Sequence, residues 1–375
     1  MDRAEVVVVG AGLIGSSIAW WLAQRGRRVV LLDRGEPAAE ASSAAGGALI
    51  PTAGGVSAPL LALYLRSLAR YGDFVQEIRE TTAAAVEYRV PGRLVLALDE
   101  VMESELRHDA ERQRAAGVRV EWLSGDQARR LEPSITPDVR AALFYLDHAL
   151  VDNQRLGPLV AHAAARAGAE LRAHEAVLAL ALEGGRVVGV ETVRGRIAAD
   201  RVILAAGCWS SQLTPWLRGA TGPAKGEMIA LQATPRPLER LVSITGVGIV
   251  PRGDGRLMVG ATRTDWDYNR DVTAEAVARM LDGARRMVPS LATARFAAAW
   301  AGLRPLTPDG APILGHDAAA AGLLWATGHL GMGILSAPAT AEILVDLIEG
   351  RPPAIPIDIF SPDRFASSPA PAAQV

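Results

Sequence analysis

Hydrophobic residues at the start of the chain predict a strand, a helix and a second strand. Residues 6–9 are four consecutive valines, a run typical of a buried parallel strand. After a glycine-rich turn, apolar and small residues predict a helix from Leu13 to Gln24, which ends at Gly26. A second apolar strand is expected over residues 29–32. The pattern therefore predicts a βαβ unit at the N-terminus.

The later pattern alternates between helices and hairpins. Helices are expected over residues 60–80, 101–116, 125–131, 154–166 (with Asn153 as cap) and 274–287. Hairpins are expected over 176–192 and 247–260, and single strands over 93–98, 201–204 and 323–327. After the last strand come further glycines and an apolar helix to Glu349, with Ser336 as its expected N-cap. This order predicts an α/β fold: a Rossmann-like domain of discontinuous segments, plus a mixed or antiparallel-sheet domain.

Composition narrows the class of protein. The chain has 375 residues, with 39 basic and 41 acidic side chains and a formal net charge of −2, which argues against a nucleic-acid binder. Cys208 is the single cysteine, so an internal disulfide and a cysteine-based metal cluster are excluded, and no metal site is expected. No signal peptide is visible, and no apolar run approaches the ~20 residues of a membrane span. We expect a cytoplasmic protein without a membrane span.

A dinucleotide fingerprint follows the first strand. Gly10, Gly12 and Gly15 form G-x-G-x-x-G between strand and helix, and Asp33 ends the second strand. The pyrophosphate is expected at the helix N-terminus, where free N–H groups and the helix dipole favour anions. A carboxylate at Asp33 suits ribose hydroxyls. Taken alone, this motif indicates an NAD-dependent dehydrogenase. The second glycine-rich helix start, near Gly328, argues against it.

The motifs in sequence order resemble the FAD-dependent D-amino-acid oxidase superfamily, and within it the glycine oxidases of the thiamine pathway. The resemblance extends from about residue 4 to about residue 350. The segments that carry it are residues 10–15, 33–34, 41–47, 205–210, 300–310 and 328–338.

The resemblance implies non-covalent FAD, since Cys208 lies outside the motif used for covalent attachment. It assigns the pyrophosphate to Gly10, Gly12, Leu13, Ile14 and Gly15, and the adenosine end to Asp33, Arg34 and the backbone of Val177. It assigns the path towards the flavin to Ser42, Ser43, Gly46, Gly47, Ala206, Gly207 and Trp209. It assigns the isoalloxazine edge to Gly331, Met332, Gly333 and Ile334.

The resemblance also implies oxidative deamination of an amine or amino acid. A hydride passes from the substrate Cα to flavin N5, and O₂ reoxidises the flavin to give H₂O₂. No side-chain acid or base is required, because the neutral amine is already a good hydride donor and the protein supplies orientation. Arg304 matches the family arginine that holds the substrate carboxylate, a role suited to a bidentate, permanently charged guanidinium.

Three pocket positions depart from the glycine oxidase pattern. Gly331 stands where the family has a second arginine, Gly248 where it has a tyrosine, and Ala48 where it has a methionine. All three changes remove bulk, so we expect a roomier and less polar pocket. Tyr268, Trp266 or Arg263, from the loop after residues 260–262, are the candidates to refill it. We expect a substrate larger than glycine, or a D- or N-substituted amino acid.

Two alternatives to the oxidase remain open. One is a dehydrogenase of the same fold that passes electrons to a quinone or protein acceptor. The other is a non-catalytic flavoprotein subunit, and a homo-oligomer is possible in each case. The expected FAD-binding domain comprises residues 1–84, 148–222 and 300–360, and the substrate domain comprises 85–147 and 223–299. Residues 361–375 are expected to form a flexible tail.

Overall fold

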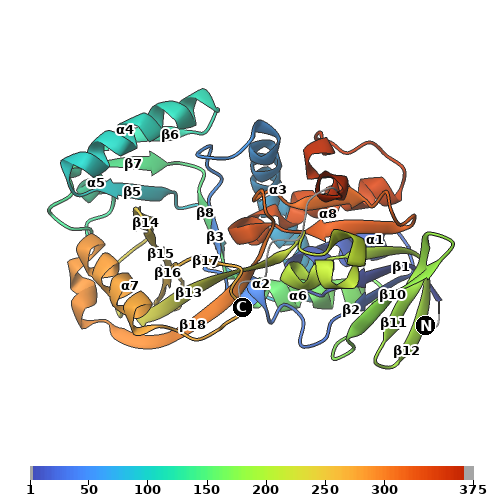
Figure 1. Cartoon of the computed structure of the whole chain (residues 1–375). Helices are drawn as coiled ribbons and strands as arrows, with labels where there is room; N and C mark the ends of the chain where they lie inside the picture. The colour runs from blue at the N-terminus through green and yellow to red at the C-terminus, as the bar shows by residue number, and fades with distance from the viewer. Residues whose placement is uncertain (1–2, 367–375) are drawn as a thin grey trace.

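The computed structural model describes residues 3–366, and it has the predicted α/β architecture. Two large sheets lie side by side, each covered by helices, and a small sheet joins them (Figure 1). The small sheet comprises β3 (Ala48–Leu49), β8 (Ala149–Val151) and β4 (Tyr88–Arg89).

The first large sheet is built on the predicted βαβ unit. Its main order is β10-β11-β12-β1-β2-β9, with β20 beside β12 and β19 beside β20. β1 is parallel to both β2 and β12, so their carboxyl ends meet at one edge of the sheet. The strands are β1 (Arg3–Val9), β2 (Val29–Leu32), β9 (Glu170–Arg172), β10 (Val177–Glu183), β11 (Arg186–Thr192), β12 (Gly195–Leu204), β19 (Ile313–His316) and β20 (Leu323–Thr327).

The second large sheet is mixed, as expected. Its order is β17-β13-β16-β15-β14-β5-β7-β6, with β18 beside β13, and all of its pairs are antiparallel except β14 with β5. The strands are β5 (Arg93–Ala97), β6 (Val120–Ser124), β7 (Ala141–Tyr145), β13 (Gly222–Gln232), β14 (Leu241–Ile244), β15 (Val247–Pro251), β16 (Arg256–Gly260), β17 (Thr264–Asp265) and β18 (Arg295–Leu306).

The helices cover the outer faces of both sheets. Beside the first sheet, α1 packs against α6 and α8, and α3 packs against the same two helices. Beside the second sheet, α7 covers one face, while α4 packs on β5, β6 and β7 (Figure 1). The helices are α1 (Leu13–Gln24), α2 (Ala41–Ala44), α3 (Ala58–Thr82), α4 (Glu100–Ala115), α5 (Gly125–Leu131), α6 (Asn153–Arg166), α7 (Ala274–Met287) and α8 (Gly333–Ile348).

One segment of the described chain, Leu330–Ile348, is long and apolar enough to cross a membrane by length and composition. The sequence analysis expected no such run. Of the 18-residue apolar stretch within this segment, 61% is buried inside the protein, where α8 packs against α1 and α3. Such burial is typical of a core helix.

Three local predictions need correction. The α8 helix begins at Gly333 and not after Ser336, because the chain turns into the helix directly from a short 3₁₀ turn. Asp152 caps α6 by accepting a hydrogen bond from the Arg155 N–H, and Asn153 is the first helical residue. The start of the expected tail is folded, because Phe365 is buried and Arg364 pairs with Asp309. The rest of that tail, from residue 367, lies outside the described residues.

The strands of the first sheet come from residues 3–204 and 313–327, and those of the second from residues 93–145 and 222–306. β13 and β18 cross the predicted domain boundaries, because β13 begins at Gly222 and β18 runs on to Leu306. The two strands pair along most of their length, so they tie the sheets together. The division into two domains stays a prediction.

Candidate functional site

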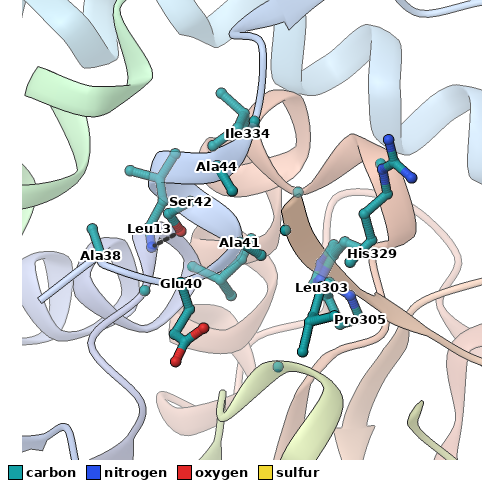
Figure 2. A pocket seen from close by; sticks show the side chains of 18 of the residues that line it. Leu13, Ala38, Glu40, Ala41, Ser42, Ala44, Leu303, Pro305, His329 and Ile334 are labelled. Atoms are coloured by element: carbon teal, nitrogen blue, oxygen red, sulfur yellow. Dashed lines mark hydrogen bonds between the residues drawn. The ribbon is translucent and has the colours of Figure 1, made fainter. Parts of the chain in front are cut away.

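A cavity of about 430 Å³ lies between the two large sheets, within the range of roughly 300–1,000 Å³ usual for ligand sites. The β1–α1 turn, the segment around α2, β18 and the start of α8 all contribute to its wall. In Figure 2, Ala38 and Glu40 lie on one side of the view, and Leu303 and Pro305 of β18 lie on the other. The cavity therefore joins the nucleotide fingerprint to the second sheet.

The β1–α1 turn brings backbone close to the cavity. Gly10 has φ +104°, and a Cβ there would lie 2.5 Å from the Ala205 carbonyl oxygen. A Cβ on Gly15 would lie 1.9 Å from the Gly10 oxygen, so Gly15 serves helix–strand packing. Gly12 differs, because a Cβ there would contact only Ser42 Oγ, at 3.4 Å. The space beside Gly12 is thus open to a ligand at the α1 N-terminus.

Asp33 and Arg34 form the end of the cavity expected to hold adenosine. The Asp33 carboxylate accepts hydrogen bonds from the Ala11 N–H at 2.8 Å and the Gly35 N–H at 2.9 Å. Burial raises the pKa of Asp33, and those two bonds oppose the shift. Each oxygen keeps a lone pair for a ribose hydroxyl. Arg34 lies 3.8 Å over the Trp209 ring and donates to Glu40.

The segment around α2 is held by two side chains that the sequence analysis did not predict as site residues. The Asn153 amide donates to the carbonyls of Ser42 at 2.7 Å and Ala45 at 2.9 Å. Arg252, only 1% exposed, donates to the Gly46 carbonyl at 3.0 Å and to Asn153 Oδ1 at 2.7 Å. Ser42 Oγ in turn accepts from the Leu13 N–H, the dashed line in Figure 2. These bonds fix the wall opposite the α1 N-terminus.

A second helix N-terminus reaches the same cavity. Gly331, Gly333 and Ile334 line it where α8 begins, and no side chain caps that helix. First-turn N–H groups without intrahelical partners favour negative charge. His329, also in the wall, is buried and shares a 3.0 Å hydrogen bond with Thr340. Burial lowers the pKa of His329 to about 3, so its ring is neutral at pH 7.

Most of the predicted site residues line this cavity. Those that do are Gly10, Gly12, Leu13, Ile14, Asp33, Arg34, Ser42, Gly46, Ala48, Val177, Ala206, Gly207, Trp209, Gly248, Arg304, Gly331, Gly333 and Ile334.

Five predicted residues lie outside the wall: Gly15, Ser43, Gly47, Tyr268 and Met332. Ser43 Oγ donates to the Ala39 and Glu40 carbonyls within its own turn. Gly47 is packed against Val151 and Arg252, with no room for a Cβ. Tyr268 is 48% exposed, and its hydroxyl accepts from Gln212, so the expectation that it fills the substrate pocket is corrected.

Arg304 presents an unpaired guanidinium to the cavity. Its Nη1 donates to the Thr262 carbonyl at 3.0 Å and more weakly to that of Lys225 at 3.5 Å. Within residues 3–366 it has no carboxylate partner within ion-pair distance. Burial lowers the pKa of Arg304, as does Arg263, while Asp265 opposes the shift. The guanidinium lies over Gly226, where a Cβ would come within 2.3 Å of it.

Comparison with known proteins decides which dinucleotide this cavity suits. The family of FAD dependent oxidoreductases (DAO) matches residues 5–347 of the chain. The chain belongs to this family. FAD is therefore its cofactor, and the glycine turn, Asp33 and the two helix N-termini fit the phosphates, ribose and flavin of that molecule.

Named relatives cover nearly the whole chain. The glycine oxidase of Geobacillus kaustophilus is 34% identical over 367 residues, which is 96% of this chain and 97% of the relative. The crystal structure of glycine oxidase from the same organism has a TM-score of 0.91 at 33% identity, and the match covers 96% of this chain and 98% of that one. An iminodiacetate oxidase from a Chelativorans species has a TM-score of 0.86 at 30% identity, with 95% and 98% covered. The protein is an FAD-dependent oxidoreductase that acts on amino acids or amines, as these relatives do.

Proposed function

We propose that this protein is an oxidase that deaminates an amino acid other than glycine, with O₂ as the electron acceptor. Bound FAD would supply the redox chemistry, as acceptor of a hydride from the substrate Cα and donor of both electrons to O₂. The substrate becomes an imine, and O₂ with two protons becomes H₂O₂. Water then hydrolyses the imine to a carbonyl compound and ammonia, or to a carbonyl compound and a primary amine where the substrate nitrogen is substituted.

The observation that carries this proposal is the free guanidinium of Arg304 in the cavity wall. Arg304 is partly buried and has no acidic partner within ion-pair distance among the described residues, which is costly for a cation, so the site is suited to an anionic ligand. The Arg304 fork can hold a substrate carboxylate with two parallel hydrogen bonds. It would orient the substrate, and the reacting carbon with it, between β18 and the start of α8.

The remaining wall supports a reaction without side-chain acid–base catalysis. The residues of the second sheet that line the cavity are apolar, small or hydroxylic, apart from arginines. His329 is kept neutral by burial, and its hydrogen bond to Thr340 fixes its orientation. These groups exclude water and shape the pocket, which suits transfer of a hydride from a neutral amine.

Product analysis tests the reaction. The purified FAD-loaded protein is supplied with D-amino acids, N-substituted glycines and glycine, and peroxide and ammonia are measured in air. From substrates with a free amino group we expect equal amounts of peroxide and ammonia, and from N-substituted glycines peroxide with an equal amount of the primary amine. We expect glycine to be a poor substrate. Turnover with an artificial electron acceptor but no peroxide would instead identify the dehydrogenase alternative. Glycine as clearly the best substrate would contradict the proposed specificity.

Substitution of Arg304 tests the carboxylate contact. Arg304→Leu should cost carboxylate substrates about 2 kcal/mol of transition-state binding, roughly a 30-fold loss of kcat/KM, because a charged hydrogen bond is removed. Amines without a carboxylate should be unaffected, and Arg304→Lys should restore part of the loss. An unchanged kcat/KM for Arg304→Leu would exclude the proposed role.

A further inference from the structure

A second arginine, Arg93 of β5, lines the same cavity. Alternate residues of a strand face opposite sides of its sheet. Leu94 and Leu96 belong to the core beneath α7, so Arg93 faces the other side, towards the cavity. Its cross-strand partner is Leu241 of β14, and Ser243 of β14 also lines the cavity. No sequence motif singled out Arg93.

The guanidinium of Arg93 lacks an acidic partner. Its Nε donates to Ser243 Oγ at 3.0 Å, and its Cζ lies 5.8 Å from the centre of the Tyr145 ring. In the part of the chain that the structure describes, Arg93 forms no ion pair, and its two terminal nitrogens donate no hydrogen bond to the protein. Asp109, whose charge acts on Arg93, already accepts hydrogen bonds from Tyr145 and Arg112 at 2.7 Å each.

The charges around the cavity are unevenly distributed. Its acidic wall residues, Asp33, Glu40 and Glu175, come from the first sheet and the loops beside it, at the end expected to hold adenosine. Each already accepts a hydrogen bond or forms an ion pair with its neighbours. The second sheet contributes Arg93 and Arg304 and no acid among the described wall residues. The substrate end therefore holds two positive charges that no carboxylate of the described wall pairs with.

We propose that Arg93 binds a second carboxylate of the substrate, so that the substrate is an amino acid with an acidic side chain or N-substituent. This rests on the proposed function, in which Arg304 holds the carboxylate next to the reacting carbon. In the sheet, β14, β15, β16 and β13 separate β5 from β18. At about 4.8 Å per strand, the two backbones are far apart, so the second acid belongs at the end of a long substituent.

Gly248 provides the space for that substituent. It pairs directly with Ser243, and a Cβ at Gly248 would be no closer than 3.6 Å to its neighbours. The absent side chain leaves a path past Ser243 towards Arg93. A side chain would fit at this position, and Arg93 and Ser243 add polar groups to the wall beside it.

A binding experiment that needs no turnover tests the role of Arg93. Linear dicarboxylates from succinate to suberate, and monocarboxylates of equal length, are titrated into the FAD-loaded protein by calorimetry. We expect the best dicarboxylate to bind at least about tenfold more tightly than its monocarboxylate, the gain typical of one charged hydrogen bond. Arg93→Met should abolish this preference and Arg93→Lys should keep part of it.

Arg107→Met is the matched control, because it removes an equal charge from an exposed side chain of α4 that stacks on Trp122. It should leave the preference intact. Equal binding of the two acids by the wild-type protein overturns the inference whether or not the variants fold, and a preference that survives Arg93→Met also overturns it. Turnover is scored separately. Dicarboxylate preference in a protein that oxidises no amine would refute the proposed function alone, and oxidation without preference would refute the Arg93 inference alone.

Discussion

At the scale of single residues, glycines determine what the substrate end of the cavity can hold. Gly226 lets the Arg304 guanidinium lie flat against β13, while Gly248 and Gly331 leave space beside the two arginines. At Gly331 a Cβ would contact Arg304 Cδ at an ordinary 3.7 Å. The missing side chain at Gly226 thus positions the Arg304 charge, and those missing at Gly248 and Gly331 leave space in the cavity.

Gly226→Ala should weaken carboxylate binding without unfolding the protein. The new Cβ would lie within 2.3 Å of the Arg304 nitrogens, which can move because they end a flexible side chain. We expect KM for carboxylate substrates to rise about tenfold, as one charged hydrogen bond is misaligned. Steady-state kinetics and a thermal melt check this together. An unchanged KM would show that Arg304 does not need this position.

Gly248→Tyr should shift the substrate preference towards small molecules. Its Cβ fits without a clash, and the ring would then occupy the space in front of Ser243. We expect kcat/KM for large or acidic amino acids to fall at least about tenfold, the effect of overfilling a pocket. Glycine should lose less. Measuring kcat/KM for one small and one large substrate decides the point, and a constant ratio would contradict the proposed path.

Single residues also mark the limit of sequence analysis here. Gly10, Gly12 and Asp33 were predictable because their spacing after a strand is a recognised motif. Arg93 was not predictable as a site residue, because an arginine in an amphipathic strand is normally expected to face solvent. Only the pairing of β5 with β14 turns it towards the cavity.

At the scale of elements, the segment around α2 depends on support from elsewhere in the chain. This four-residue helix, residues 41–44, has no buried residue, and it lines the cavity through Ala41, Ser42 and Ala44. A helix this short is not stable by itself. The Asn153 amide and the buried Arg252 hold the backbone of this segment, so the geometry of the cofactor wall depends on α6 and on the residue that follows β15.

Asn153→Ala should therefore weaken FAD binding. It removes hydrogen bonds to the Ser42 and Ala45 carbonyls and the acceptor for Arg252. We expect a loss of about 2 kcal/mol in stability and about a tenfold higher Kd for FAD, measured by flavin fluorescence on the apoprotein. Asn153→Asp keeps the acceptor but loses the donor, so it separates the two contributions. FAD affinity equal to that of the wild type would refute this support.

The elements with clear periodicity were the predictable ones. The structure gives α1 and β2 the predicted bounds, and the capping box of α5 is present as expected. The long β18 strand was not predicted. Its sequence, RFAAAWAGLRPL, is rich in alanine and lacks a strict alternation, and its pairing with β13 makes it a strand. The start of α8 was missed because Ser336 resembles an N-cap.

At the scale of the whole molecule, the cavity joins two layers that have separate cores. In the proposed arrangement the first sheet supplies the cofactor half and the second the substrate half, and β13 and β18 link the two sheets. Because FAD binds the folded state, saturation at 100 times its Kd should add about 2.7 kcal/mol to stability. Two buried histidines, His148 and His329, make the free energy of unfolding depend on pH.

Acid should destabilise the protein before its carboxylates titrate. Burial lowers the pKa of His148 and of His329 to about 3, and both have an ordinary value of 6.5 when unfolded. The unfolded chain thus binds more protons below pH 6.5, and stability falls as pH falls. Between pH 6.5 and about pH 5 we expect a loss of about 1.4 kcal/mol per pH unit for each histidine. Urea melts across this range check it, and the double variant His148→Gln with His329→Gln should flatten the slope. A slope as steep in that variant would contradict the assignment.

The most direct test of the account is an anaerobic titration of the FAD-loaded protein with amino acids, followed by the visible flavin absorbance. We predict that at least one amino acid with a second carboxylate bleaches the flavin completely, and that air restores the colour with release of one peroxide per flavin. Arg304→Leu should bleach far more slowly with the same compound. A protein whose flavin is reduced by dithionite but by no amino acid or amine would contradict the proposed function.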